Sequence, residues 1–189
     1  MNRLSSHQLP AILLVVCVFA VALSSVAQVH PKLQAAIFIK LLNYDMSLAR
    51  KPQNVIKFHI VIDSATASQQ NALQKEFSVI SNQKISGKRV EVVTSDIKTL
   101  VSDTSLDQGA AHIYYLPDGS SVKTLKTVLT SAKPWKIAVL GGNSQLVEAG
   151  AAVGISLDNG KPQIIVNLKQ SRAQGMNLSS QLLKLAKVI

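Results

Sequence analysis

Cysteine is almost absent from this sequence. The 189 residues include one cysteine, Cys17, which lies in an apolar run near the amino terminus. The rest of the chain has no thiol, which excludes disulfide bonds, iron–sulfur clusters, cysteine zinc sites and thiol nucleophiles from it. Glycine and proline are also scarce, at nine and six residues, so collagen-like and low-complexity architectures are excluded. The length and the 47% hydrophobic content suit one domain with a full core.

The apolar run has the organisation of an export signal. Arg3 precedes thirteen apolar residues, Ala11 to Leu23, and small residues follow at Ser25 and Ala27. A helix of that length spans roughly 20 Å, less than a membrane-spanning helix needs. We predict a signal peptide over residues 1–27 with cleavage after Ala27, a periplasmic location and a mature domain over residues 28–189. Retention of the segment as a membrane anchor remains an alternative.

Acidic residues are few, with 10 Asp and Glu against 20 Lys and Arg. Loss of Arg3 with the signal leaves 19 basic residues and a formal charge of +9. Export makes nucleic acid a poor partner, so an acidic protein, a membrane surface or an anionic small ligand remains, beside simple solubility. Basic patches could form from Lys123, Lys126 and Lys133, and from Lys84, Lys88 and Arg89, although a solvated surface is the simpler interpretation.

Hydrophobic periodicity predicts alternating strands and helices. Helices are expected at 31–44, 66–80, 121–131 and 178–189, the second one beginning with a capping box of Thr66 and Gln69. Strands are expected at 56–63, 88–94, 110–116, 136–140, 153–157 and 163–168. Asn159-Gly160, between the last two strands, is a strong hairpin signal. We therefore predict a single three-layer α/β domain with a mostly parallel sheet, helices on both faces and an antiparallel C-terminal hairpin.

Motifs of known chemistries are missing from the mature chain. No G-x-S-x-G pattern occurs, and acidic residues do not pair at close spacing except Asp103 and Asp107, in a polar loop. His30, His59 and His112 lack a metal-type partner two to four residues away, and the last two read as strand histidines with satisfied nitrogens. We therefore predict a protein that is not an enzyme, with no cofactor, no metal and no catalytic residues.

One glycine-rich turn is a candidate ligand-binding site. Gly141-Gly142-Asn143-Ser144 follows a predicted strand, and its backbone N–H groups could bind an anion, although it matches neither nucleotide-binding fingerprint. A tight turn with a helix cap is the simpler interpretation. If a ligand binds, a doubly wound sheet places it past the carboxyl ends of the strands. The crevice residues predicted there are Asp63, Ser64, Thr94, Asp118, Gly141, Gly142, Asn143 and Ser144.

The C-terminal third resembles a known family. The segment 153–161, the strand Ile164-Ile165-Val166-Asn167-Leu168, Gly175 and the segment 178–186, Leu-Ser-Ser-Gln-Leu-Leu-Lys-Leu-Ala, together resemble the YfiR-like family of small exported bacterial proteins. The chain departs from the family's pattern because it has no paired cysteines in the mature domain. It also has Tyr44-Asp45-Met46 where members commonly carry a Trp-Pro pair, and Gly141-Gly142 where they carry Ser-Asp.

The resemblance implies a regulator that acts by binding. Such a protein would bind and inhibit the periplasmic sensor domain of an inner-membrane diguanylate cyclase or related sensor protein, and so control cyclic-di-GMP and biofilm formation. The first predicted helix is apolar on more than one face, which would suit a homodimer. The alternative is a periplasmic binding module for a small anionic ligand at the crevice. An exported hydrolase or an anchored envelope subunit is a third hypothesis.

Overall fold

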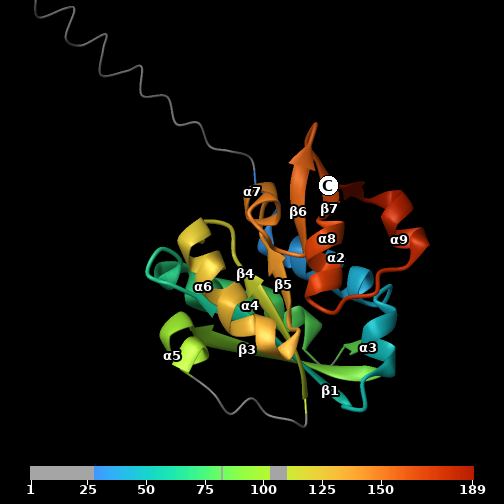
Figure 1. The fold of residues 1–189 in the computed structure, drawn as a ribbon. Helices are drawn as coiled ribbons and strands as arrows, with labels where there is room; N and C mark the ends of the chain where they lie inside the picture. The colour runs from blue at the N-terminus through green and yellow to red at the C-terminus, as the bar shows by residue number, and fades with distance from the viewer. Residues whose placement is uncertain (1–27, 82, 103–109) are drawn as a thin grey trace, which may run out of the picture.

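The computed structural model describes residues 28–81, 83–102 and 110–189, so the predicted signal peptide lies outside the described residues. An eight-stranded sheet runs through the molecule in the order β2-β3-β1-β4-β5-β6-β7-β8 (Figure 1). The strands are β1 (Val55–Ile62), β2 (Lys84–Ile85), β3 (Lys88–Asp96), β4 (Ala110–Leu116), β5 (Ala138–Gly141), β6 (Val153–Asp158), β7 (Lys161–Val166) and β8 (Lys187–Val188).

Most strand pairs are parallel. β1 pairs in parallel with β3 and β4, and the parallel series continues through β4–β5 and β5–β6. β6 and β7 form the predicted antiparallel hairpin around Asn159 and Gly160, which adopt the positive φ angles of 50° and 75° that such a tight turn requires. The mostly parallel α/β prediction is confirmed.

Helices cover both faces of the sheet. The described helices are α2 (Pro31–Leu42), α3 (Met46–Arg50), α4 (Gln70–Phe77), α5 (Ile97–Ser102), α6 (Val122–Ala132), α7 (Ser144–Glu148), α8 (Leu168–Ala173) and α9 (Ser180–Leu185). β1 alternates its side chains between two cores, because successive strand residues point to opposite faces. Phe58 and Ile60 pack with α2 and α4, whereas Val61 packs with α5, α6 and α7. Among the described residues, no helix is both long enough and apolar enough to cross a bilayer.

The larger core contains four buried aromatic rings. Phe58 lies 5.6 Å from Phe77 between ring centroids, and Phe38 lies 5.4 Å from Tyr115. Each such pair contributes about 0.5–1.5 kcal/mol beyond the burial of its apolar area. These contacts join α2 to β4 and α4 to β1 within the larger core.

Three local predictions were wrong. The Thr66 hydroxyl bonds to Asp63 instead of capping the following helix, and that helix begins with a 3-10 turn at Ala67–Gln69. The predicted C-terminal helix ends at Leu185, and Lys187–Val188 instead adds strand β8 alongside β7. The fourth predicted strand begins two residues late, at Ala138, because Lys136 adopts a left-handed turn conformation with φ 49°.

The two strand histidines contact each other. Nε2 of His59 on β1 lies 2.9 Å from Nδ1 of His112 on β4, and Nδ1 of His59 lies 2.9 Å from the Ser95 hydroxyl. Their ring nitrogens thus take part in hydrogen bonds across neighbouring strands, as expected for strand histidines. The part of the chain that the structure describes contains no group of three or more His, Cys, Asp or Glu residues arranged to hold a metal ion.

Candidate functional site

The predicted crevice residues mostly lie at one edge of the sheet, where parallel strands end. Asp63 follows β1, and Asp118 follows β4 shortly after its end. Gly141 ends β5, and Gly142 and Asn143 connect it to Ser144, the first residue of α7. They do not line one continuous crevice. Asp63 and Ser64 border one open hollow, whereas Asp118 and the residues 142–144 border a second hollow of about 340 Å³. Thr94 lies within β3, where its Oγ1 is buried and has no hydrogen-bond partner.

Asp63 is committed to internal hydrogen bonds. Its carboxylate accepts from the hydroxyls of Thr124 and Thr66, and from the backbone N–H groups of Thr66 and Ala65 at 3.0 Å each. Burial alone raises the pKa of Asp63, but these four hydrogen bonds outweigh burial and hold the pKa below its ordinary value. Asp63 therefore joins the end of β1 to the first turn of α6. Its carboxylate oxygens already accept four hydrogen bonds from within the protein.

Asp118 and Asn143 join the two turns that follow β4 and β5. Nδ2 of Asn143 donates to Oδ1 of Asp118 at 2.6 Å, while the side-chain Oδ1 of Asn143 caps α7 by accepting from the Leu146 N–H at 2.9 Å. The turns approach so closely that a Cβ on Gly142 would lie 2.3 Å from the Asp118 nitrogen. Gly142 is therefore required by packing, which supports the tight-turn interpretation of this glycine pair.

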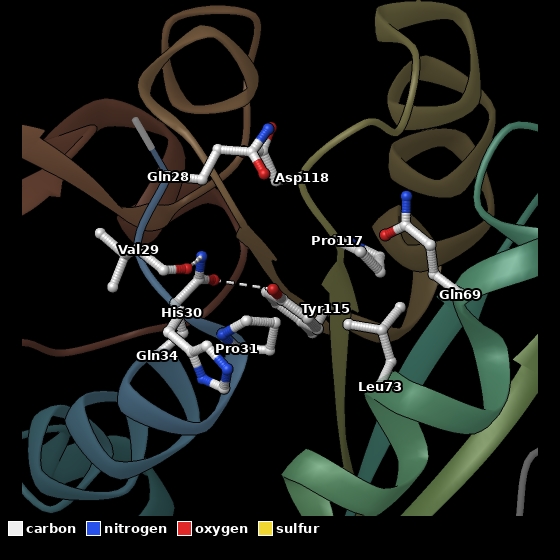
Figure 2. Close-up of a pocket in the computed structure, with 10 residues that line it drawn as sticks. All are labelled: Gln28, Val29, His30, Pro31, Gln34, Gln69, Leu73, Tyr115, Pro117 and Asp118. Carbon is white, nitrogen blue, oxygen red and sulfur yellow. Dashed lines mark hydrogen bonds between the residues drawn. The ribbon is translucent and has the colours of Figure 1, made fainter. Parts of the chain in front are cut away.

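Gln34 is the residue at this edge that sequence reasoning missed. Its side chain is buried in α2, where it donates to the carbonyl oxygens of Val29 at 2.9 Å and Gly142 at 3.2 Å. It also accepts a hydrogen bond of 2.7 Å from the Tyr115 hydroxyl (Figure 2). A glutamine among the many apolar residues of this helix was the available signal, because a buried amide needs partners for its donors and its acceptor.

Gln34 holds the segment before α2 across the strand ends. Gln28 and Val29 line both the 340 Å³ hollow and a neighbouring hollow of about 250 Å³, and Asp118 is shared by the two as well. Figure 2 draws Gln28 and Asp118, which both line the two hollows, above the buried Gln34–Tyr115 pair. The amino-terminal segment and Asp118 therefore form the boundary between the two hollows.

The charges around the hollows bear on which ligand they could accept. The described residues that line the two hollows beside Gln28 include one acidic residue, Asp118. They include no Lys and no Arg. The hollow at Asp63 and Ser64 also has Lys98 and Lys123 on its border, together with Asp96. An anion would therefore find cationic side chains beside Asp63 but not beside the Gly142 turn.

A third surface feature lies at the carboxyl terminus of the chain. Leu185, Val188 and Ile189 are exposed, and Leu185 is the most exposed at 68%. We call these three residues the C-terminal edge. β8 covers only Ile165 and Val166 of its neighbour β7, so the edge of β7 from Lys161 to Ile164 is not covered by β8. Exposed apolar side chains beside an uncovered strand edge are typical of interaction surfaces.

Known proteins resemble this chain in sequence and in fold. A family profile described as YfiR/HmsC-like matches residues 31–187. A conserved domain protein from Vibrio cholerae O1 biovar El Tor is 16% identical, with a TM-score of 0.55 over 86% of this chain and 61% of that chain. The ABC domain in complex with L-Trp from Streptococcus pneumoniae is 14% identical, with a TM-score of 0.53 over 84% of this chain and 60% of that chain.

The likeness to these two solved structures is a likeness of fold. The chain spans about three fifths of the length of each of the two solved structures. At such low identity the likeness establishes the α/β fold alone, because one fold hosts many unrelated functions. No curated protein matches the sequence.

Proposed function

Because this chain belongs to the YfiR/HmsC-like family, we propose that it is a periplasmic regulatory protein that works by binding a partner. The partner proposed is the sensor domain of an inner-membrane signalling enzyme of the diguanylate cyclase type. Binding would hold that enzyme inactive, and release would raise cyclic-di-GMP and promote biofilm formation. Inhibition of this kind needs only a higher affinity for the inactive receptor conformation, and no reactive side chain.

The observation that carries the proposal is the contrast between the strand-end residues and the C-terminal edge. The polar groups of Asp63 and Gln34 are used in internal hydrogen bonds, which is a structural role. By contrast, the C-terminal edge exposes apolar side chains that contribute little to the domain's own core. We propose this edge as the receptor-binding surface, since buried apolar anchors supply most of the free energy of protein association.

A crosslinking pull-down from the envelope fraction tests the proposal. We expect the tagged mature protein to recover one inner-membrane GGDEF or sensor protein, and deletion of its gene to raise cyclic-di-GMP. Leu185→Glu should abolish both recovery and repression, whereas Val79→Glu, at another exposed apolar residue, should leave them intact. Equal loss in both variants, or recovery of self-associated protein alone, contradicts the proposal.

The cellular location needs its own test. We propose that residues 1–27 are removed on export and that the mature protein begins at Gln28. Release by osmotic shock, with a mature N-terminal peptide beginning at Gln28 by mass spectrometry, is the expected result. Retention of the full mass in the membrane fraction would instead support the anchor alternative.

A homodimer also remains a proposal. The expectation came from the apolar first helix, but α2 buries Ala35, Phe38, Leu41 and Leu42 within its own domain. Leu33 is the exposed large apolar side chain of that helix. Analytical ultracentrifugation of wild type and Leu33→Glu will show whether a dimer forms through α2, and a monomeric wild type rejects it.

The second candidate function is binding of a small anionic ligand. The observation that favours it is the pair Lys98 and Lys123 beside Asp63 and Ser64. Titration calorimetry with inorganic phosphate should then show binding that Lys98→Gln weakens. The same titration with Ser144→Ala, at the other hollow, should be unchanged.

A further inference from the structure

One segment of the chain has a charge of a single sign, and its first lysine, Lys123, also borders the hollow at Asp63. From Val122 to Lys136 the chain holds four lysines and no acidic residue, together with the only tryptophan of the protein. The segment comprises α6 and the 3-10 turn Lys133–Trp135. We call the five exposed side chains Lys123, Lys126, Lys133, Trp135 and Lys136 the α6 face.

Packing determines which side of α6 faces outward. Leu125, Val128 and Ala132 are buried against the sheet. Lys123, Lys126 and Lys133 therefore lie on the solvent side of the segment. Figure 1 shows α6 in the outer helical layer, over β4 and β5. Thr127 and Thr130, also exposed, bond to backbone carbonyls of the same helix. Lys123, Lys126 and Lys133 therefore share the solvent side of α6. Lys136 lies in the turn after the helix, where its side chain packs near Gly175 and borders a hollow with Asp45.

A constrained turn holds the tryptophan just after the end of α6. Trp135 is 44% exposed, and Lys136 has the left-handed φ of 49°, unusual for a residue with a side chain. The turn is held by hydrogen bonds from Lys136 N–H to Lys133 O and from Ile137 N–H to Ala132 O, both 3.2 Å. Gly175 packs so closely that an added Cβ would lie 3.2 Å from Cβ of Lys136. The backbone of the turn that carries the exposed indole is thus held on both sides of Trp135.

The elements packed against α6 do little to neutralise it. α5 contributes Lys98, α7 contributes the exposed Glu148, and the exposed Asp96 at the end of β3 borders the same hollow as Lys123. Asp63, at the start of α6, is buried and already accepts four hydrogen bonds. The described surroundings therefore leave the α6 face with a net positive charge.

We propose that the α6 face docks the protein onto an anionic phospholipid surface. Lysines near such a surface each strengthen binding about fivefold, and their long stems let the ammonium groups reach the phosphates. Tryptophan prefers the membrane–water interface, where its ring is partly apolar and its N–H remains hydrated. Exposed lysines along one side of α6, followed by an exposed indole, supply both the positive charge and the interfacial ring that an anionic lipid surface favours. The proposal does not depend on the receptor proposed above.

The single tryptophan supplies the assay. Vesicles of phosphatidylcholine with phosphatidylglycerol should shift Trp135 emission to the blue and sediment the mature protein, and phosphatidylcholine alone should do neither. Binding should disappear in about 1 M salt, where the screening length falls to about 3 Å. No blue shift with anionic vesicles overturns the proposal, as does an equal shift with phosphatidylcholine alone.

Two matched variants distinguish binding through the α6 face from attraction by the protein's net charge. The first replaces the four lysines of the α6 face with glutamine, and the second replaces Lys32, Lys40, Lys75 and Lys84, which are exposed on α2, α4 and β2. Both remove four charges, and circular dichroism checks that both fold. We expect the first to weaken vesicle binding by about tenfold or more and the second to weaken it far less. Equal weakening means that net charge alone attracts the protein and overturns the proposal.

An acidic polypeptide tests the other class of partner. Poly-L-glutamate should leave Trp135 emission unchanged at concentrations where anionic vesicles shift it. A shift with poly-L-glutamate and none with vesicles would assign the α6 face to an acidic protein and reject the membrane.

Discussion

The Tyr115 hydroxyl donates a 2.7 Å hydrogen bond to Oε1 of Gln34, although 81 residues separate them in the chain. Both side chains are buried, and the Gln34 amide continues the network to the backbone of Val29 and Gly142. This pair joins α2, β4 and the turn after β5 at the edge where the strands end. Burial of Tyr115, together with the nearby charge of Asp118, raises the pKa of its hydroxyl far above the ordinary value of 10.0. Tyr115 therefore stays neutral and remains a donor.

Gln34→Ala should destabilise the protein by about 2–4 kcal/mol, because it leaves the Tyr115 hydroxyl and the Gly142 carbonyl buried without their partner. Urea unfolding measures the change. Gln74→Ala, at an exposed position of α4, serves as the control and should change stability by less than about 0.5 kcal/mol. Similar small changes in both variants would mean that the network contributes nothing measurable.

Gly142→Ala should be among the most damaging glycine substitutions. Its Cβ would lie 2.3 Å from the Asp118 nitrogen, a backbone atom that cannot move without displacing the turn after β4. We expect a loss of more than about 3 kcal/mol, from overpacking of a rigid site. Gly160→Ala meets no atom within 4 Å and carries only the strain of a φ of 75°, about 1 kcal/mol. Thermal unfolding that ranks the two in the opposite order contradicts this geometry.

The carboxylate of Asp63 should make stability depend on pH in the acid range. Its folded-state pKa lies below the ordinary 3.8, so it stabilises the fold fully above about pH 4 and loses that contribution as the pH falls through the lowered value. Asp63→Asn should therefore be clearly less stable than wild type at pH 7. The difference should shrink in chemical denaturation at pH values below 3.8. A difference that stays constant with pH would mean that the charge is not what the hydrogen bonds stabilise.

Two leucines of α9 should behave differently on substitution. Leu182 is buried in the larger core, so Leu182→Ala should cost about 2–5 kcal/mol. Leu185 is 68% exposed, so Leu185→Ala should change stability by less than about 0.5 kcal/mol while weakening partner recovery in the pull-down. If Leu185→Ala unfolds the protein, the C-terminal edge is a structural element and not a free surface.

Features with local causes were predictable from the sequence. β4 lies at the predicted residues 110–116, because a run of apolar and aromatic residues ends at the Pro117-Asp118-Gly119 turn. Ser121 caps α6 through the Thr124 N–H at 3.0 Å. The Asn159-Gly160 hairpin formed because those two residues tolerate the positive φ angles of its turn.

Two features were not predictable from local patterns. Thr66 had the spacing of a capping residue, but its hydroxyl instead donates to the Asp63 carboxylate three residues earlier, in a competing local turn. Lys187 and Val188 continued a helical pattern, but they pair with β7 as a strand. In this second case a tertiary partner outweighed a weak local preference.

The sequence by itself determined the alternation of strands and helices, the hairpin, the two-sided core and the membership of the family, because these follow from periodicity, turn chemistry and residue order. Only the tertiary structure decided which polar groups at the strand ends are used up, as with Asp63 and Gln34, and which side chains stay exposed, as with Leu185 and Trp135. The physical reason is that hydrogen-bond satisfaction and burial depend on residues brought together from distant parts of the chain.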